Sequence, residues 1–294
     1  MTRAVVSFVA DVVLDAHAEV GEGPTWDRVR QQLWWVDIPR GAIHRFDPAS
    51  GTDHVHVVDQ PVGAVVVRRG GDLLLAVRDG FGVLEEGRLK IVAAVEADVA
   101  GNRMNDGKVD PAGRFWAGTM ASDTAAGAGA LYRLQKDHRV DTVLSGLTIS
   151  NGMDWSLDDK TMYFIDSAGG SVKAFSYDRR TGAIDAPRTL IVIPEEDGVP
   201  DGMTVDSAGF LWIAVWGGAA VRRYSPDGEL VGEVRLPVSQ VTSCAFGGPT
   251  MHDLYITTAS KELTPAQREE QPHAGALFRV RPGVAGRQPH LADL

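Results

Sequence analysis

A unit of about 40 to 50 residues recurs six times along the chain, and this repeat limits the possible folds more than any other sequence feature. Each unit contains an apolar run with strand-like composition, a polar turn, and a second run in which apolar and charged residues alternate. The first runs begin at residues 33, 73, 115, 162, 211 and 254, and the second runs occupy residues 43–46, 82–84, 130–134, 172–175, 221–224 and 276–279. A β-rich repeat of this length is typical of a β-propeller, in which each repeat forms one four-stranded blade.

We therefore predict an all-β fold, a single six-bladed β-propeller domain that spans residues 1–294. The residues around Val12 to Ala16 are expected to supply a strand that completes the last blade, which would close the ring and remove an open sheet edge. Helical periodicity is nearly absent, and the one predicted helix covers residues 264–270, with Thr264 as its cap and Pro265 in its first position.

Glycine is unusually frequent, with 33 of the 294 residues, whereas the usual share is roughly 7%. We expect the excess glycines in the crowded turns around the propeller axis, with positive φ angles, and in tight outer turns. Aspartates are also frequent in the outer turns. We assign Asp110, Asp206 and their counterparts a structural role, because Asp, Pro, Ser and Gly together are typical of hairpin turns.

Composition excludes several classes of partner. The net charge of −10 makes nucleic acid and anionic membrane surfaces unfavourable partners. No segment approaches the ~18 apolar residues that a membrane-spanning helix requires. Asp11 and Asp15 interrupt the apolar N-terminal run too early for a signal peptide, and the single Cys244 excludes an internal disulfide, so we expect a cytoplasmic protein. The sequence indicates no particular oligomeric state.

A second set of positions follows the same period and predicts a metal site. Six turns can be aligned on a residue followed by a small one, and they begin at residues 22, 62, 106, 151, 201 and 243. If these turns lead into the innermost strands, then Glu22, Asn151 and Asp201 converge on the axis from three blades, with Asn105 and Asp106 from a fourth. Converging carboxylates repel one another unless a cation lies between them, and hard divalent cations prefer such oxygen ligands. Ordinary Asx–Gly turns are the alternative explanation.

Other catalytic motifs are missing from the sequence. No histidine falls in the aligned positions, and the chain contains no HExxH, no GxSxG nucleophile elbow and no phosphate-binding P-loop. Ser150 stands next to Asn151 without an obvious base. A serine nucleophile and a bound nucleotide are therefore disfavoured.

Long motifs closely resemble the regucalcin–gluconolactonase family, which is also known as the senescence marker protein type. The resemblance covers nearly the whole chain, and the motifs that carry it occupy residues 21–26, 102–110 with 116–120, 150–156, 200–203, 246–249 and 254–259. It implies a six-bladed propeller with one divalent cation in the central tunnel and the hydrolysis of sugar lactones. The family's metal ligands fall on Glu22, Asn151 and Asp201, and the residues that bind substrate oxygens fall on Arg103 and Asn105.

The chain departs from the animal members of the family at one place. They carry an acidic pair after the Ala-Gly-Thr-Met run, where this chain has Ala121, Ser122 and Asp123. Asp123 is a shorter substitute that we expect to contact substrate, and the small residues 125–130 suit a mobile lid. The choice of sugar lactone therefore stays open.

The resemblance implies a mechanism. The cation (Ca, Mg, Mn, Zn or Fe) would polarise a gluconolactone-like aldonolactone, and Asp201 would act as general base on a water molecule to give the aldonic acid. Arg103 and Asn105 would orient the sugar and offset the charge that develops on oxygen. Two alternatives stay open: a metal-dependent hydrolase of another ester, lactone or phosphotriester, and a calcium-binding propeller without catalysis.

Overall fold

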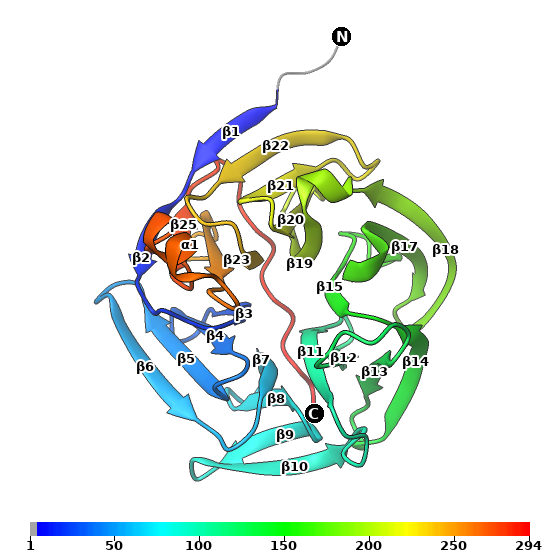
Figure 1. The fold of residues 1–294 in the computed structure, drawn as a ribbon. Coiled ribbons are helices and arrows are strands. Elements are labelled where there is room, and N and C mark those ends of the chain that lie inside the picture. The colour runs from blue at the N-terminus through cyan, green and yellow to red at the C-terminus, as the bar shows by residue number, and fades with distance from the viewer. Residues whose placement is uncertain (1–4) are drawn as a thin grey trace.

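The protein forms a six-bladed β-propeller in a computed structural model that describes residues 5–294 (Figure 1). Blade 1 contains β3 (Gly21–Asp27), β4 (Gln32–Asp37), β5 (Ala42–Asp47) and β6 (Thr52–Val57). Blade 2 contains β7 (Val62–Val67), β8 (Leu73–Val77), β9 (Gly80–Glu85) and β10 (Arg88–Ala94). Blade 3 contains β11 (Asn102–Val109), β12 (Phe115–Ala121), β13 (Gly129–Leu134) and β14 (Val140–Leu147). Blade 4 contains β15 (Ser150–Trp155), β16 (Thr161–Asp166), β17 (Ser171–Asp178) and β18 (Ala183–Val192).

The last two blades use the N-terminal segment as well. Blade 5 contains β19 (Val199–Val205), β20 (Leu211–Trp216), β21 (Ala220–Tyr224) and β22 (Leu230–Arg235), and β1 (Val6–Val9) adds to it in parallel beside β22. Blade 6 contains β23 (Val241–Gly247), β24 (Asp253–Thr258), β25 (Leu277–Val280) and β2 (Asp11–Leu14), which pairs antiparallel with β25. The N-terminal segment therefore links two neighbouring blades. The parallel strand β1 had no counterpart in the sequence prediction.

The predicted fold class is confirmed, and the predicted strand pairs have a definite place in each blade. The apolar first runs are the second strands, from β4 to β24, and the alternating runs are the third strands, from β5 to β25. The second strands are almost completely buried because both of their faces pack against neighbouring blades. Their Trp35, Trp116 and Trp212 side chains are among the largest fully buried ones. Residues 5–294 also contain three short helices: η1 (Ser167–Gly169), η2 (Glu195–Asp197) and the predicted α1 (Pro265–Glu270), which Thr264 caps.

Buried aspartates in two outer turns stabilise the blades in which they lie. Asp110 accepts hydrogen bonds from the backbone N–H groups of Ala112 and Arg114 and, through its other oxygen, from Trp116 Nε1, each at 2.9 Å. Asp206 repeats this arrangement in blade 5, where Trp212 Nε1 donates at 3.0 Å. One buried carboxylate thus closes the turn and fixes the core tryptophan of the following strand, which confirms the structural role predicted for both aspartates.

The aligned positions near the axis lie in strands, which corrects the prediction of turns. They fall within the inner strands β3, β7, β11, β15, β19 and β23, and in each strand the pairing with its neighbour shifts at that point, as in a β-bulge. Of the aligned glycines only Gly23 has a positive φ, 53°. The others are required by close approach: a Cβ atom on Gly107, for example, would lie 2.7 Å from the carbonyl oxygen of Trp116.

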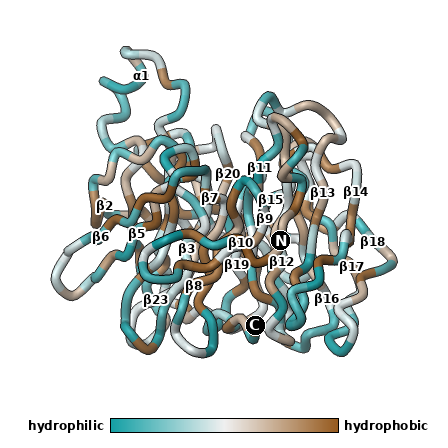
Figure 2. The backbone as a smooth tube through the Cα atoms, turned by 90° about the horizontal axis from the view of Figure 1, so that it is seen from below, coloured by the Kyte–Doolittle hydropathy of each residue, from teal (hydrophilic) through white to brown (hydrophobic). Residues whose placement is uncertain are grey.

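The two faces of the propeller carry different segments. Each inner strand begins at the face that carries α1 and ends at the opposite face, near the C-terminus (Figure 2). The C-terminal segment, residues 285–294, crosses the centre of the ring (Figure 1) from a bridge with Asp206 to one with Arg68. Within residues 5–294, no helix is long and apolar enough to cross a membrane.

Close packing at the axis leads to a stability prediction. A Cβ atom at Gly63 would clash with the carbonyl oxygen of Asn105 and lie 2.6 Å from that of Met104, so the adjacent blade would have to move. We expect Gly63→Ala to lower the free energy of unfolding in urea by about 1–3 kcal/mol. Gly70→Ala is the matched control, because its nearest neighbour, an oxygen of Asp72, is 3.9 Å away. Equal stability of the two variants would contradict the proposed packing constraint.

Candidate functional site

Five polar side chains are buried near the axis at the start of the inner strands. Glu22 lies on β3, Asn105 and Asp106 on β11, Asn151 on β15 and Asp201 on β19, and each is at most 7% exposed. Glu22 interacts electrostatically with both Asp201 and Asp106, so the structure brings acidic side chains from three blades close together. The convergence that the repeat indicated is therefore present in the fold.

The acidic side chains strongly influence one another. Burial, together with the negative charges of Asp201 and Asp106, raises the pKa of Glu22 well above its usual range. Burial and the charge of Asp106 likewise raise the pKa of Asp201 well above its ordinary value. Burial also raises the pKa of Asp106, although Lys108 opposes this shift. Such a group of carboxylates is costly to ionise without a positive partner.

Two oxygens at this cluster lack hydrogen bonds. In the described part of the chain, Asn151 Oδ1 and Asp201 Oδ1 are buried and have no hydrogen-bond partner. Buried polar atoms rarely lack a hydrogen-bond partner, so a bound ligand is expected to contact these two oxygens. An amide oxygen and carboxylate oxygens are ligands that fit a hard divalent cation. Over residues 5–294, no group of three or more His, Cys, Asp or Glu side chains is placed to hold a metal ion.

Arg103 lies beside the acidic cluster and is linked to Asn105. Its Nη1 donates to Asn105 Oδ1 at 2.8 Å and to the carbonyl oxygen of Met104 at 3.0 Å. The other end of the Asn105 amide donates to the carbonyl oxygen of Ser150 at 2.9 Å, so Asn105 connects blade 3 to blade 4. Burial lowers the pKa of Arg103 to about 10, even though Glu22 and Asp201 oppose this shift. The guanidinium is thus held in a fixed position.

Asp123 is placed differently from the other candidates. It is exposed in the loop between β12 and β13, and its Oδ1 accepts a hydrogen bond from the backbone N–H of Ala125 at 3.1 Å. The pairing of Asn102 with Ala121 places this loop at the same end of blade 3 as Arg103. Among the described residues Asp123 makes no hydrogen bond to Arg103 or Asn105, so its contact with substrate stays a prediction.

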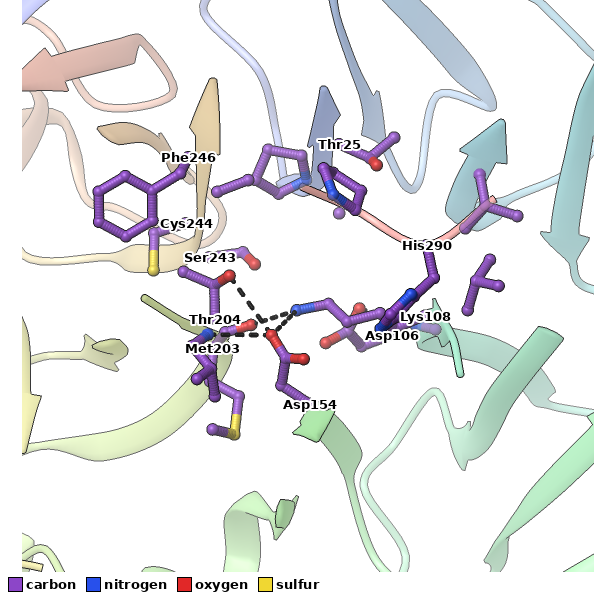
Figure 3. A pocket seen from close by; sticks show the side chains of 18 of the residues that line it. Thr25, Asp106, Lys108, Asp154, Met203, Thr204, Ser243, Cys244, Phe246 and His290 are labelled. Carbon is purple, nitrogen blue, oxygen red and sulfur yellow. Dashed lines mark hydrogen bonds and ion pairs between the residues drawn. The ribbon is translucent and has the colours of Figure 1, made fainter. Parts of the chain in front are cut away.

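A small chamber of about 50 Å³ lies deeper along the tunnel (Figure 3). Its lining includes Lys108, Asp154 and, from the C-terminal segment, Arg287. Lys108 Nζ lies 3.2 Å and Arg287 Nη2 2.6 Å from oxygens of Asp154. Although burial raises the pKa of Asp154, these two cations hold it below its usual value. The chamber thus contains charges that compensate one another.

Sequence reasoning missed several of these contacts. Lys108 and Asp154 follow the aligned positions by two and three residues, so the same repeat could have indicated them. Glu96 was also missed: its carboxylate accepts hydrogen bonds from Asn102 Nδ2 at 2.9 Å, from Thr119 Oγ1 at 3.0 Å and from Tyr132 at 2.7 Å. It joins three strands of blade 3 next to Arg103. No spacing in the sequence connects Glu96 to these partners.

Known proteins share this sequence and fold. The family described as SMP-30/Gluconolactonase/LRE-like region matches residues 20–260. Regucalcin of Pongo abelii is 40% identical over 293 residues, which cover 97% of this chain and 98% of the relative. The structure of regucalcin from Agrobacterium tumefaciens, described as a calcium-binding protein, matches with a TM-score of 0.95 and 31% identity over 99% of both chains. A luciferin-regenerating enzyme matches with a TM-score of 0.91 and 33% identity over 97% of this chain and 99% of its own.

The family match and the near full-length identity agree with the motifs identified in the sequence. They also agree with the fold, because these two solved structures superpose over almost the whole propeller. The chain therefore belongs to the SMP-30/gluconolactonase family.

Proposed function

We propose that this protein is a divalent-metal-dependent lactonase that opens a gluconolactone-like sugar lactone to the aldonic acid. The main support is the buried cluster of Glu22, Asn151 and Asp201. It contains two acidic side chains, and the oxygens Asn151 Oδ1 and Asp201 Oδ1 have no hydrogen-bond partner. Membership in a family described by gluconolactonase supports the same class of substrate. A small uncharged sugar lactone also suits a narrow, acidic tunnel better than a polyanion would.

One divalent cation is the proposed cofactor, held by Glu22, Asn151 and Asp201. The unpartnered Asn151 Oδ1 and Asp201 Oδ1 are the atoms that fit it best. When bound, the cation would polarise the lactone and stabilise negative charge that develops on oxygen. Calcium is one candidate because a solved relative is described as calcium-binding; Mg, Mn, Zn and Fe are the others.

The chain's own residues supply the proton transfer and the orientation of the sugar. The Asp201 carboxylate would accept a proton from the attacking water as its oxygen bonds to the carbonyl carbon. The ring C–O bond then breaks, and the proton passes to the departing oxygen, which becomes the sugar hydroxyl. Arg103, fixed by Asn105 at 2.8 Å, would donate hydrogen bonds to sugar oxygens and offset developing charge. Asp123 would contact the sugar when its loop closes.

A cytoplasmic calcium-binding protein without catalysis is the second candidate, since the Agrobacterium relative is described only as calcium-binding. The two functions differ in turnover. A panel of gluconolactone, xylonolactone, an acyl-homoserine lactone and paraoxon, assayed with each cation added to the stripped protein, separates them. Cation binding without hydrolysis of any compound would favour the second candidate.

The raised carboxylate pKa values predict how stability without metal depends on pH. In the stripped protein the folded state keeps protons on Glu22 and Asp201 to higher pH than the unfolded chain does. The free energy of unfolding should therefore fall as pH rises from the ordinary carboxylate range through the raised pKa values. Asp201→Asn removes one of these groups, so in chelator the variant should show a weaker fall and exceed the wild type in stability at pH 8.

Added cation should reverse this order. At a free concentration of about 100 times its Kd, the cation should stabilise the wild type by about 2.7 kcal/mol, whereas Asp201→Asn should lose most of that gain. Urea unfolding at pH 5 and pH 8, with chelator or with calcium, measures both effects. Identical pH profiles of the two proteins in chelator would contradict the proposed charge repulsion.

Asp201 should also be essential for turnover. We expect Asp201→Ala to lower kcat for gluconolactone by at least about 10²–10⁴-fold, because general base catalysis contributes roughly this factor. The rate is measured by acid release, and circular dichroism checks that the propeller remains folded. Wild-type turnover by the Asp201→Ala variant with calcium present would refute the assigned role.

Arg103 should affect the binding and turnover of substrate but not the binding of the cation. Arg103→Ala should lower kcat/KM by about 10- to 100-fold, since hydrogen bonds from a charged donor contribute roughly 1.5–3 kcal/mol. Its calcium content after dialysis should equal that of the wild type. Loss of the cation from this variant would show that Arg103 stabilises the metal site instead.

A further inference from the structure

Ser167 connects two of the proposed metal ligands although it lies outside the inner strands. It begins η1, directly after β16, and is 5% exposed. Its Oγ accepts a hydrogen bond from Asn151 Nδ2 at 3.0 Å and donates one to the carbonyl oxygen of Pro200 at 2.7 Å. Pro200 immediately precedes Asp201, so this hydroxyl lies between blades 4 and 5 and contacts the segments that carry Asn151 and Asp201.

The hydrogen-bonding chemistry of the three groups fixes the direction of each bond. The carbonyl oxygen of Pro200 can only accept, so the single hydroxyl proton of Ser167 points toward it. The hydroxyl oxygen then has only lone pairs to offer to Asn151. The Asn151 side chain must therefore turn its NH₂ group toward Ser167, which leaves Oδ1 directed away from the hydroxyl, and this is the buried oxygen without a partner.

This direction matters because an asparagine amide has two nearly isosteric orientations. In the opposite orientation, Asn151 Oδ1 would face the lone pairs of Ser167, and the NH₂ group would take the place of the proposed ligand oxygen. A cation repels N–H donors, so only one orientation can bind it. The Ser167 hydroxyl selects that orientation before the cation arrives.

The backbone around Ser167 holds the hydroxyl in place. The N–H of Ser167 donates to the carbonyl oxygen of Ile149 at 3.0 Å. The carboxylate of the preceding Asp166 accepts hydrogen bonds from the N–H groups of Ile149 at 2.9 Å and Thr148 at 3.1 Å. These three bonds tie the start of η1 to the two residues just before β15, which carries Asn151. The hydroxyl and the amide therefore belong to one rigid unit.

We propose that Ser167 is a positioning residue that orients the Asn151 amide and thereby sets the affinity of the cation site. The proposal rests on the proposed cation site. It gives the contact between blades 4 and 5 at Ser167 a role in metal binding. Partners of this kind orient metal ligands, and their removal typically weakens metal binding by about 10- to 100-fold. Ser167 itself touches neither the cation nor the substrate.

Calcium affinity measured by calorimetry on the stripped full-length protein tests this role. We expect Ser167→Ala to weaken binding by about 10- to 100-fold and Ser167→Thr, which keeps a hydroxyl on the same carbon, to restore most of it. Ser260→Ala is the matched control. The buried Ser260 hydroxyl also donates to a backbone carbonyl oxygen, that of Ala18 at 2.8 Å, but has no contact with Asn151, so calcium affinity should stay unchanged.

A double-mutant cycle separates orientation from general loss of structure. Asn151→Asp replaces the amide by a carboxylate, whose two oxygens are equivalent, so its binding should not depend on which one faces Ser167. The cost of Ser167→Ala should therefore largely disappear in the Asn151→Asp background. An equal loss in both backgrounds, or wild-type affinity of Ser167→Ala alone, would overturn the proposal.

Failure of the proposed function gives a different result. If the wild type binds calcium with the predicted Ser167 dependence but hydrolyses no lactone, the lactonase proposal fails and the positioning role stands. If the folded wild type binds no calcium and none of the other cations, both proposals are overturned.

Discussion

The crowding of acidic side chains on the axis of a closed ring is the constraint on which the rest of the structure depends. Glu22, Asp106 and Asp201 are buried on inner strands whose backbones lie close to their neighbours. Their repulsion is offset locally, by Arg103 beside Glu22 and Asp201 and by Lys108 near Asp106. The protein therefore maintains an unfavourable arrangement of charge, which a divalent cation would relieve.

Backbone packing determines where these carboxylates point. A residue with a Cβ atom in place of Gly152 would meet the carbonyl oxygen of Asp201 and, at 2.9 Å, the N–H nitrogen of Met203. At these glycines the backbones of neighbouring inner strands are in direct contact. The bulges then turn the residue before each glycine toward the axis. The glycines thus act on the site indirectly, because they allow four blades to place polar side chains in one small volume.

The repeat alone was sufficient to predict the blades and the axial residues, because strand period and axial register are local properties of each unit. The turns assigned at Glu22 and Asn151 were wrong, since a residue followed by glycine is equally compatible with a turn and with a bulged strand. Ser167 and Arg287 could not be predicted, because their partners lie in other blades or at the far end of the chain. Contacts between repeats, such as those of Ser167 with Pro200 and of Arg287 with Asp154, leave no periodic pattern in the sequence.

The two ends of the propeller axis carry different residues. The C-terminal segment crosses the face where the inner strands end, and its Arg287 lies 2.6 Å from Asp154 in an ion pair. Arg103 and the Asp123 loop lie at the opposite end of the axis, so in the proposed lactonase the substrate would reach the acidic cluster from that side. Under the proposed function, changes in the exposed Asp123 loop would alter which lactone is admitted without moving the buried axial residues. The departure from the family pattern at residues 121–123 would then concern the choice of substrate and leave the proposed chemistry intact.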